Sequence, residues 1–176
     1  WIASIEYFDK PKLNINTRKL FYDGTVQIPE ITLTNVPEDC YTIEIEKGSD
    51  IGYYKITSTL FGDLYEGTKT DYYRIMPPDT DIKSISARSK GITLTPSNIC
   101  EKVDGYQIEY RIDQIKPDIT TVNFTNNGSV QFTKTGLLPS TRYQVRIRAY
   151  KDVIKERKKV RYYSDWSSYK KVTTLK

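Results

Sequence analysis

Apolar and polar residues alternate along much of the chain, and this period of two constrains the fold more than any other feature. In YTIEIE (41–46) tyrosine and the isoleucines take the odd positions, whereas threonine and the glutamates take the even ones. GYQIEYR (105–111) and YQVRIRAY (143–150) alternate in the same way. Successive side chains of a β-strand point to opposite faces, so this pattern indicates strands with one buried face. Glycine, asparagine and proline clusters separate the runs, and an all-β sandwich fold is therefore expected.

One hairpin is predicted around Asn127-Gly128. Asn-Gly suits a type I′ turn, in which both central residues need a positive φ. Asn123-Phe-Thr and Asn127-Gly-Ser also fit the acceptor pattern for N-glycosylation, but the turn interpretation is favoured because asparagine is common in turns. The apolar residues flanking the turn are Val122 and Phe124 on one side and Val130 and Phe132 on the other.

A domain boundary is predicted at the consecutive prolines Pro77 and Pro78. Two prolines fix φ, remove two backbone donors and favour an extended path, so a strand must end there. A chain of 176 residues is long enough for two small domains. We therefore expect one domain at residues 1–76, a short stiff linker at 77–80 and a second domain at 81–176.

The residue types present argue against catalysis. Histidine is absent, which removes the commonest general base near neutral pH and the commonest metal ligand. The sequence contains no phosphate-binding loop, no nucleophile elbow and no loop with calcium-binding spacing. We expect no catalytic residue, no cofactor and no metal. Two cysteines, Cys40 and Cys100, cannot form a disulfide framework by themselves, and buried single thiols are the favoured interpretation.

The excess positive charge is concentrated in one segment. The formal net charge is +5, and Lys151–Arg161 (KDVIKERKKVR) carries much of it. A solvated loop or hairpin tip between the last two strands is the favoured interpretation, and attraction of a polyanion is the alternative. No apolar run reaches the roughly 20 residues that span a bilayer, so no membrane insertion is expected. WIASIEYFDK (1–10) lacks the features of a signal peptide, so a secreted protein would contain this chain as an internal piece.

Residues 81–176 resemble a fibronectin type III domain. DGYQIEYR is similar to the third strand of that family, TGLLPSTRYQVRIRAY to the turn and sixth strand, and YYSDWSSYKKVTT to the last strand. In that family a leucine and a proline precede a tyrosine whose hydroxyl bonds nearby backbone. The resemblance assigns these structural places to Leu138, Pro139 and Tyr143. Pro96 stands near the position of the family's usual core tryptophan, and Trp166 does not replace that residue by position.

The region Leu20–Pro77 resembles the small immunoglobulin-like repeats of bacterial surface proteins. The matching pieces are YDGTVQIPEITL, YTIEI, IGYYKIT and GDLYEGTKTDYYRIMP, with Cys40 where an acidic residue is common. Together the two resemblances imply two tandem β-sandwich domains, immunoglobulin-like and then fibronectin type III-like. They also imply a secreted or wall-attached bacterial protein.

The candidate site is a ladder of Arg146, Arg148 and Trp166. If Trp166 lies on the last strand, both arginines share its outward face, and each guanidinium can stack on the indole for roughly 0.5–1 kcal/mol. The segment YSDWS also resembles the Trp-Ser-x-Trp-Ser signature of cytokine receptor domains, with tyrosine in place of the first tryptophan and without their paired cysteines. A structural ladder is favoured, and an exposed recognition patch is the alternative.

These features predict a non-catalytic spacer or adhesion module of a bacterial surface or secreted protein, located outside the cell or on its surface. The expected partners are an unknown protein or glycan ligand and other domains of the parent chain, and no nucleic acid. One alternative is an accessory, carbohydrate-binding module of a secreted polysaccharide-degrading enzyme. Another is a receptor-type protein-binding module, which would be favoured if Trp166 and its arginines were exposed and unstacked.

Overall fold

The computed structural model describes residues 10–62, 66–114, 118–128 and 131–176. They form two compact units, one with the described residues up to Leu20 and Gly24–Ile75, the other with Phe21–Asp23 and Met76–Lys176. The chain is all-β, and the only helical turn in its described part is η1 (Glu38–Cys40). Accordingly, these residues contain no helix with the length and apolar character needed to span a lipid bilayer.

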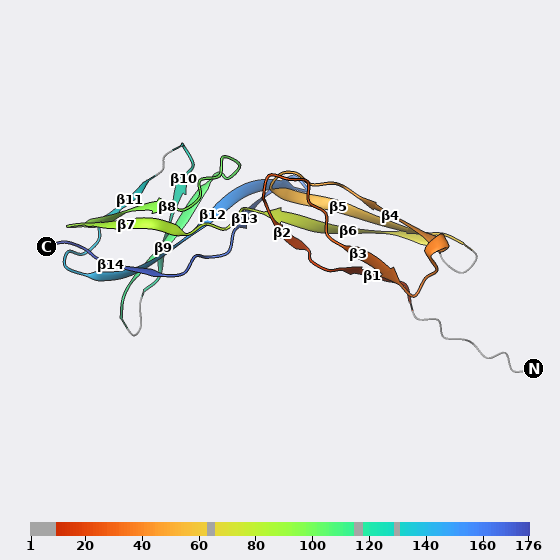
Figure 1. Cartoon of the computed structure of the whole chain (residues 1–176), viewed down its shortest axis with the longest axis horizontal. Coiled ribbons are helices and arrows are strands. Elements are labelled where there is room, and N and C mark those ends of the chain that lie inside the picture. Colours follow the sequence, from red (N-terminus) through yellow and green to blue (C-terminus); the bar gives the residue numbers. More distant parts are fainter. Residues whose placement is uncertain (1–9, 63–65, 115–117, 129–130) are drawn as a thin grey trace, which may run out of the picture. The chain divides into compact units, whose positions relative to one another are not determined.

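The first unit contains a two-stranded and a four-stranded sheet (Figure 1). The two-stranded sheet pairs β1 with β3, and the four-stranded sheet has the order β2-β6-β5-β4. The strands are β1 (Lys12–Ile15), β2 (Lys19–Phe21), β3 (Ile31–Thr34), β4 (Tyr41–Ile45), β5 (Gly52–Leu60) and β6 (Gly67–Met76). Ile56, Tyr73 and Ile75 are almost completely buried. Alternation along β5 and β6 therefore supplies this unit's core.

The Tyr73 hydroxyl joins three backbone segments of the first unit. It accepts a hydrogen bond from the Gly48 N–H at 2.9 Å and lies 2.8 Å from the carbonyl oxygens of both Gln27 and Glu46. The Tyr54 ring stacks on the Tyr73 ring with centroids 5.3 Å apart. A Cβ at position 48 would lie 2.5 Å from the Tyr54 ring, so this close approach requires glycine.

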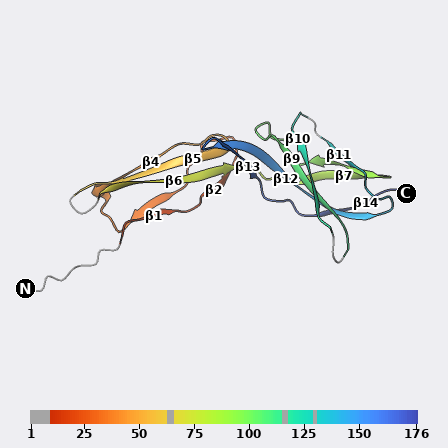
Figure 2. The ribbon, with the colours of Figure 1, turned by 180° about the vertical axis from the view of Figure 1, so that it is seen from behind.

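The second unit packs a five-stranded sheet against a three-stranded sheet. In the larger sheet β12 pairs with β9 on one side and with both β13 and β14 on the other, and β10 pairs with β9 (Figure 2). The larger sheet contains β9 (Gly105–Ile112), β10 (Thr120–Thr125), β12 (Arg142–Lys155), β13 (Lys158–Tyr163) and β14 (Lys170–Thr173), and the smaller contains β7 (Ile82–Arg88), β8 (Gly91–Pro96) and β11 (Phe132–Thr135). The buried residues Ile92, Leu94, Tyr106, Ile108, Val145 and Ile147 form the core.

The predicted hairpin around Asn127-Gly128 is wrong. β10 pairs with β9 and β11 pairs with β8, so the two strands belong to different sheets. Gly128 has φ 80°, whereas no positive φ occurs at Asn127, so the turn is not type I′. The Phe124 and Phe132 rings meet with centroids 5.2 Å apart, each from its own sheet. Val130 lies outside the described residues. Alternation defines which face of a strand is buried, but it does not name the pairing partner.

The basic segment Lys151–Arg161 forms a β-hairpin from the end of β12 and the start of β13. Val153 pairs with Val160, and Lys155 pairs with Lys158. The two turn residues, Glu156 and Arg157, both have a positive φ, 50° and 64°. Asp152 bridges to Arg161 at 2.6 Å and to Lys159 at 2.9 Å, so part of the positive charge is paired within the hairpin.

Two further expectations concern the prolines and the cysteines. Pro77 is less than 2% exposed and Thr80 is 7% exposed, and both belong to the second unit. The limits 1–76, 77–80 and 81–176 stay a prediction.

Cys40 and Cys100 are both partly exposed and form no disulfide in the described structure. The expectation of buried thiols is therefore wrong.

Candidate functional site

The segment between β13 and β14 attaches to β12 through serine hydroxyls. The Ser164 Oγ accepts a hydrogen bond from the Ala149 N–H at 3.0 Å, and the Ser164 N–H donates to the Ala149 carbonyl at 3.0 Å. Ser167 repeats both contacts with Ile147, each at 2.9 Å. The hydroxyls thus replace carbonyl groups as acceptors for two buried N–H groups of β12, which satisfies their hydrogen-bonding requirement without a regular strand.

This segment advances three residues for every two residues of β12. Ser164 lies beside Ala149 and Ser167 beside Ile147, and Lys170 pairs with Val145 where β14 begins. Consequently, side chains three positions apart on the segment lie over side chains two positions apart on β12. Trp166 precedes β14 (Lys170–Thr173), so its predicted position on the last strand is corrected.

The three-residue step places aromatic rings and arginines in alternation. The Arg148 Cζ lies 3.6 Å from the centroid of the Tyr163 ring and 4.2 Å from that of the Trp166 ring. The Arg146 Cζ lies 4.6 Å from the Trp166 centroid and 4.7 Å from the Tyr169 centroid. Both guanidinium groups are therefore held between two rings.

A third arginine, from β9, extends the stack. The Arg111 Cζ lies 4.2 Å from the centroid of the Tyr169 ring. Each arginine–ring contact contributes roughly 0.5–1 kcal/mol at an exposed site and more when it is shielded from water. We call this stack the arginine–aromatic ladder; in order, its members are Tyr163, Arg148, Trp166, Arg146, Tyr169 and Arg111.

Every arginine of the ladder is also hydrogen-bonded to a side chain on a neighbouring strand. Arg148 donates to Gln107 Oε1 from Nε at 2.9 Å and from Nη2 at 2.7 Å. Arg111 donates to Gln144 Oε1 at 3.0 and 2.8 Å. Arg146 forms a two-point pair with Glu109, at 3.0 and 2.8 Å. Planar guanidinium groups suit such paired contacts, which fix their orientation over the rings.

Glu109, the ion-pair partner of the ladder residue Arg146, is buried, with 6% of its side chain exposed. Burial opposes its ionisation, but hydrogen bonds from Arg146 and from the Tyr169 hydroxyl outweigh this effect and hold the pKa of Glu109 below its usual value. Burial, aided by the hydrogen bond to Glu109, raises the pKa of Tyr169. Burial also lowers the pKa of Arg148. The ladder thus contains charged groups in defined pairs rather than a loose basic patch.

The structure brings the predicted residues Arg146, Arg148 and Trp166 together in one stack. Sequence reasoning missed Tyr163, Tyr169 and the more distant Arg111. The usable signal was a spacing of three, since Tyr163, Trp166 and Tyr169 recur at that interval, but a search for period two does not detect it.

The predicted structural residues Leu138, Pro139 and Tyr143 lie at the entry to β12. The Tyr143 hydroxyl accepts a hydrogen bond from the Leu138 N–H at 3.0 Å, and Tyr143 itself is 4% exposed. The Pro139 carbonyl accepts a hydrogen bond from the Thr141 hydroxyl at 2.8 Å. The tyrosine thus fixes the turn that precedes the longest strand of the unit.

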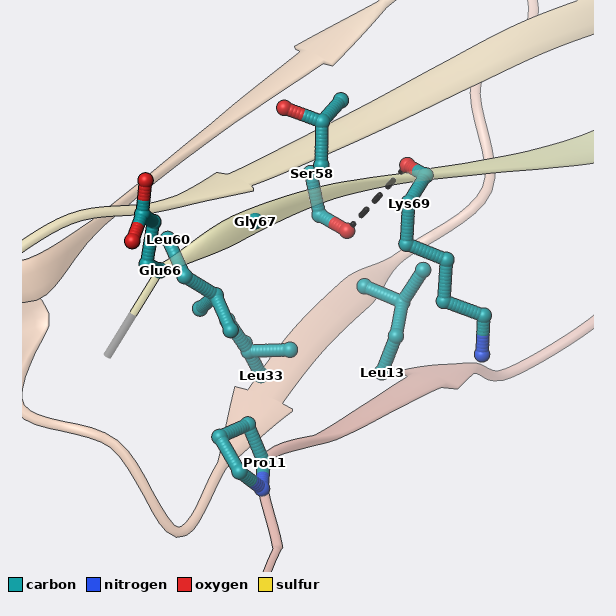
Figure 3. A pocket seen from close by; sticks show the side chains of 9 residues that line it. Pro11, Leu13, Leu33, Ser58, Leu60, Glu66, Gly67 and Lys69 are labelled. Atoms are coloured by element: carbon teal, nitrogen blue, oxygen red, sulfur yellow. Dashed lines mark hydrogen bonds between the residues drawn. The ribbon is translucent and has the colours of Figure 1, made fainter. Parts of the chain in front are cut away.

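The first unit has a cavity of about 230 Å³ near one end of its sheets. Figure 3 shows Leu13 and Leu33 on one side, and Ser58 and Leu60 on the other. The Ser58 hydroxyl donates to the Lys69 carbonyl at 3.4 Å. The three leucines give the cavity an apolar part, and the charged residues Glu66 and Lys69 also line it.

The chain is similar to one family model and to several solved structures. Residues 76–162 match the family model described as "Fibronectin type III domain". Similar solved structures include a fibronectin type III domain of human contactin 1, at 20% identity and a TM-score of 0.47, covering 58% of this chain and 82% of that chain. A structure titled "Myokine structure" has 14% identity and a TM-score of 0.44, covering 56% of this chain and 99% of that chain.

The chicken CNTN1 FN1-FN3 domains have 22% identity and a TM-score of 0.43, and the match covers 85% of this chain and 52% of that chain. No curated protein sequence matches the chain.

Proposed function

We propose that this chain, whose second half is a fibronectin type III domain, is a non-catalytic spacer or adhesion module of a bacterial surface or secreted protein. Domains of this family are typically non-catalytic and extracellular, which supports the general role. The immunoglobulin-like resemblance of the first half, consistent with its β-strands, supports the bacterial and surface-attached assignment.

The observation that carries the proposal is the arginine–aromatic ladder. Its arginines are stacked and hydrogen-bonded at once, so two N–H donors of each arginine and its ring contacts are used within the domain. Ordering a flexible arginine costs conformational entropy, and here the arginines are already ordered when the domain folds, without a ligand. Because the ladder side chains are partly buried and already paired with one another, a stiff structural element is favoured. A recognition surface would have to break these contacts to bind a ligand.

An exposed, unstacked Trp166 would have favoured a receptor-type module, and the stacking of Trp166 with Arg146 and Arg148 disfavours it. The partner of the proposed module is a protein or a glycan, together with other domains of the parent chain. Exposed side chains away from the ladder would make the contacts with that partner.

The test is a binding and activity screen of the purified chain against bacterial wall material and a panel of polysaccharides. Trp166→Phe, which keeps an aromatic ring, is the matched variant. The proposal expects no hydrolysis, and expects that any saturable binding has the same affinity in the variant. Hydrolysis of a sugar or peptide bond that a single carboxylate substitution abolishes would overturn it. So would binding that a correctly folded Trp166→Phe variant has lost.

A further inference from the structure

The outermost strand of the larger sheet in the second unit lacks the usual protection of a sheet edge. β10 (TTVNFT, 120–125) pairs with β9 alone (Figure 2) and contains no charged residue and no proline. Natural proteins commonly protect edge strands with lysine, proline, a bulge or short length. Among the other described edge strands of this unit, β7, β11, β13 and β14 all carry lysine or arginine. β10 is the exception.

The backbone groups that β10 presents outward follow from its register. Thr125 lies opposite Gly105, and the next residue, Asn126, donates its N–H to the Asp104 carbonyl at 2.7 Å. Backbone groups alternate between the two sides of a strand, so the even-numbered residues of β10 bond to β9. The outward N–H and C=O groups belong to Thr121, Asn123 and Thr125. Within the described residues these three N–H groups have no hydrogen-bond partner.

We propose that β10 is a self-association edge, at which the β10 strands of two copies of this chain pair antiparallel about a two-fold axis at Asn123. In this register Asn123 faces Asn123 of the second copy, and Thr121 faces Thr125. These are the residues whose N–H and C=O groups point outward, and each facing pair exchanges two hydrogen bonds. The two larger sheets then form one continuous sheet.

Side-chain chemistry favours a second copy as the occupant. Val122 faces Phe124 of the second copy on the core side, and Thr121 faces Thr125 on the other side. A shift by one residue would place apolar side chains opposite polar ones, so the alternation disfavours that shift. No like charges face each other across the axis. The two-fold contact uses the same patch on both copies and therefore closes at a dimer.

The polar side of β10 links the proposed axis to the ladder. The Asn123 Oδ1 accepts a hydrogen bond from Gln107 Nε2 at 2.9 Å, and Gln107 Oε1 accepts from Arg148. Asn123 is therefore held in place by the ladder, and less side-chain entropy is lost when its amide meets the amide of the second copy.

Sedimentation equilibrium of the full chain tests the proposal. The comparison is between the wild type and Thr121→Lys/Thr125→Lys, which places lysines opposite each other across the axis. Thr135→Lys/Thr173→Lys adds the same charge on other strands and is the control. We expect a dimer in the wild type and the control, and at least about a tenfold weaker dimer in the edge variant. A wild type that stays monomeric at about 1 mM, or an edge variant that dimerises like the wild type, overturns the proposal.

A cross-link tests the register. Asn123→Cys, in a chain that also carries Cys40→Ser and Cys100→Ser, places two thiols across the axis at facing positions whose Cα atoms are about 5.5 Å apart, a separation that a disulfide spans. Rapid oxidation to a disulfide dimer is expected, with Thr135→Cys in the same background as the slow control. Equal rates for the two variants would mean that β10 is not the contact. Circular dichroism of every variant checks folding, which the outward positions should not affect.

Discussion

The guanidinium of Arg148 lies over the indole of Trp166, with its Cζ 4.2 Å from the ring centroid. The arginine comes from β12, whereas the tryptophan comes from the irregular segment that follows β13. Two serine hydroxyls hold that segment on β12, so the stacking depends on backbone hydrogen bonds as much as on the rings. The ladder therefore holds the segment between β13 and β14 against β12.

Trp166→Ala should lower the free energy of unfolding of the second unit by about 2–4 kcal/mol, because it removes a large partly buried ring and two arginine contacts. Urea unfolding followed by circular dichroism measures the loss. Trp166→Phe, which retains a smaller ring, should lose less. A loss below about 0.5 kcal/mol for the alanine variant would show that the ladder contributes little to stability.

Ser164→Ala should destabilise the same unit by about 1–3 kcal/mol, because the Ala149 N–H would lose its acceptor in a buried place. Ser168→Ala, at an exposed neighbouring position, is the control and should change stability by no more than about 0.5 kcal/mol. Thermal unfolding of the two variants gives the comparison. If Ser164→Ala and Ser168→Ala were equally stable, water would have replaced the Ser164 hydroxyl as the acceptor for the Ala149 N–H.

The Arg146–Glu109 pair should make stability depend on pH. The pKa of Glu109 is lower in the folded chain than the usual glutamate value of about 4.3. The stabilisation that ionised Glu109 gives to the folded chain is therefore complete above about pH 4.3, and it is lost as the pH falls toward the lower pKa of the folded chain. Glu109→Gln should be less stable than the wild type at about pH 7, and the difference should shrink by about pH 3. Melting temperatures across this range test the prediction, which a pH-independent difference would contradict.

Tyr73→Phe should destabilise the first unit and leave the second unaffected. The change leaves the Gly48 N–H without its acceptor and removes the contacts with two carbonyl groups, at a cost of about 1–3 kcal/mol. Hydrogen exchange resolved by residue would show faster exchange in the first unit alone, that is, in the described residues up to Leu20 and in Gly24–Ile75. Tyr41→Phe, on the edge strand β4, is the control. Faster exchange in both units would contradict the prediction.

Fragments test the predicted limits of the second domain. Pro77 and Thr80 are buried in the chain and belong to the second unit, so a fragment of residues 76–176 should melt at a higher temperature than one of residues 81–176. Loss of this buried surface should cost about 1–2 kcal/mol. Equal melting temperatures would support the narrower limits of 81–176 and a linker role for residues 77–80.

Several features could be predicted because they depend on neighbouring residues alone. Alternation in 143–150 identifies a strand, and the sequence from Leu138 to Tyr143 indicates the turn before it. The partners of β10 could not be predicted in this way. An Asn-Gly pair allows a hairpin, but it equally allows the chain to cross between sheets, and the packing of Phe124 against Phe132 selects the crossing.

The sequence by itself determined the all-β class and the faces of the strands, because period-two patterning follows from backbone geometry. Arg146, Arg148 and Trp166 are predicted to form a ladder on the premise that Trp166 lies on the last strand, and the structure stacks them from a different position. Only the tertiary structure decided that Arg111 joins the stack and that Trp166 precedes the last strand. Both depend on how far one segment advances along its neighbour. Here the hydroxyls of Ser164 and Ser167 bond the segment to β12 so that three residues of the segment lie beside two residues of β12. This long-range relationship leaves no period-two pattern in the sequence.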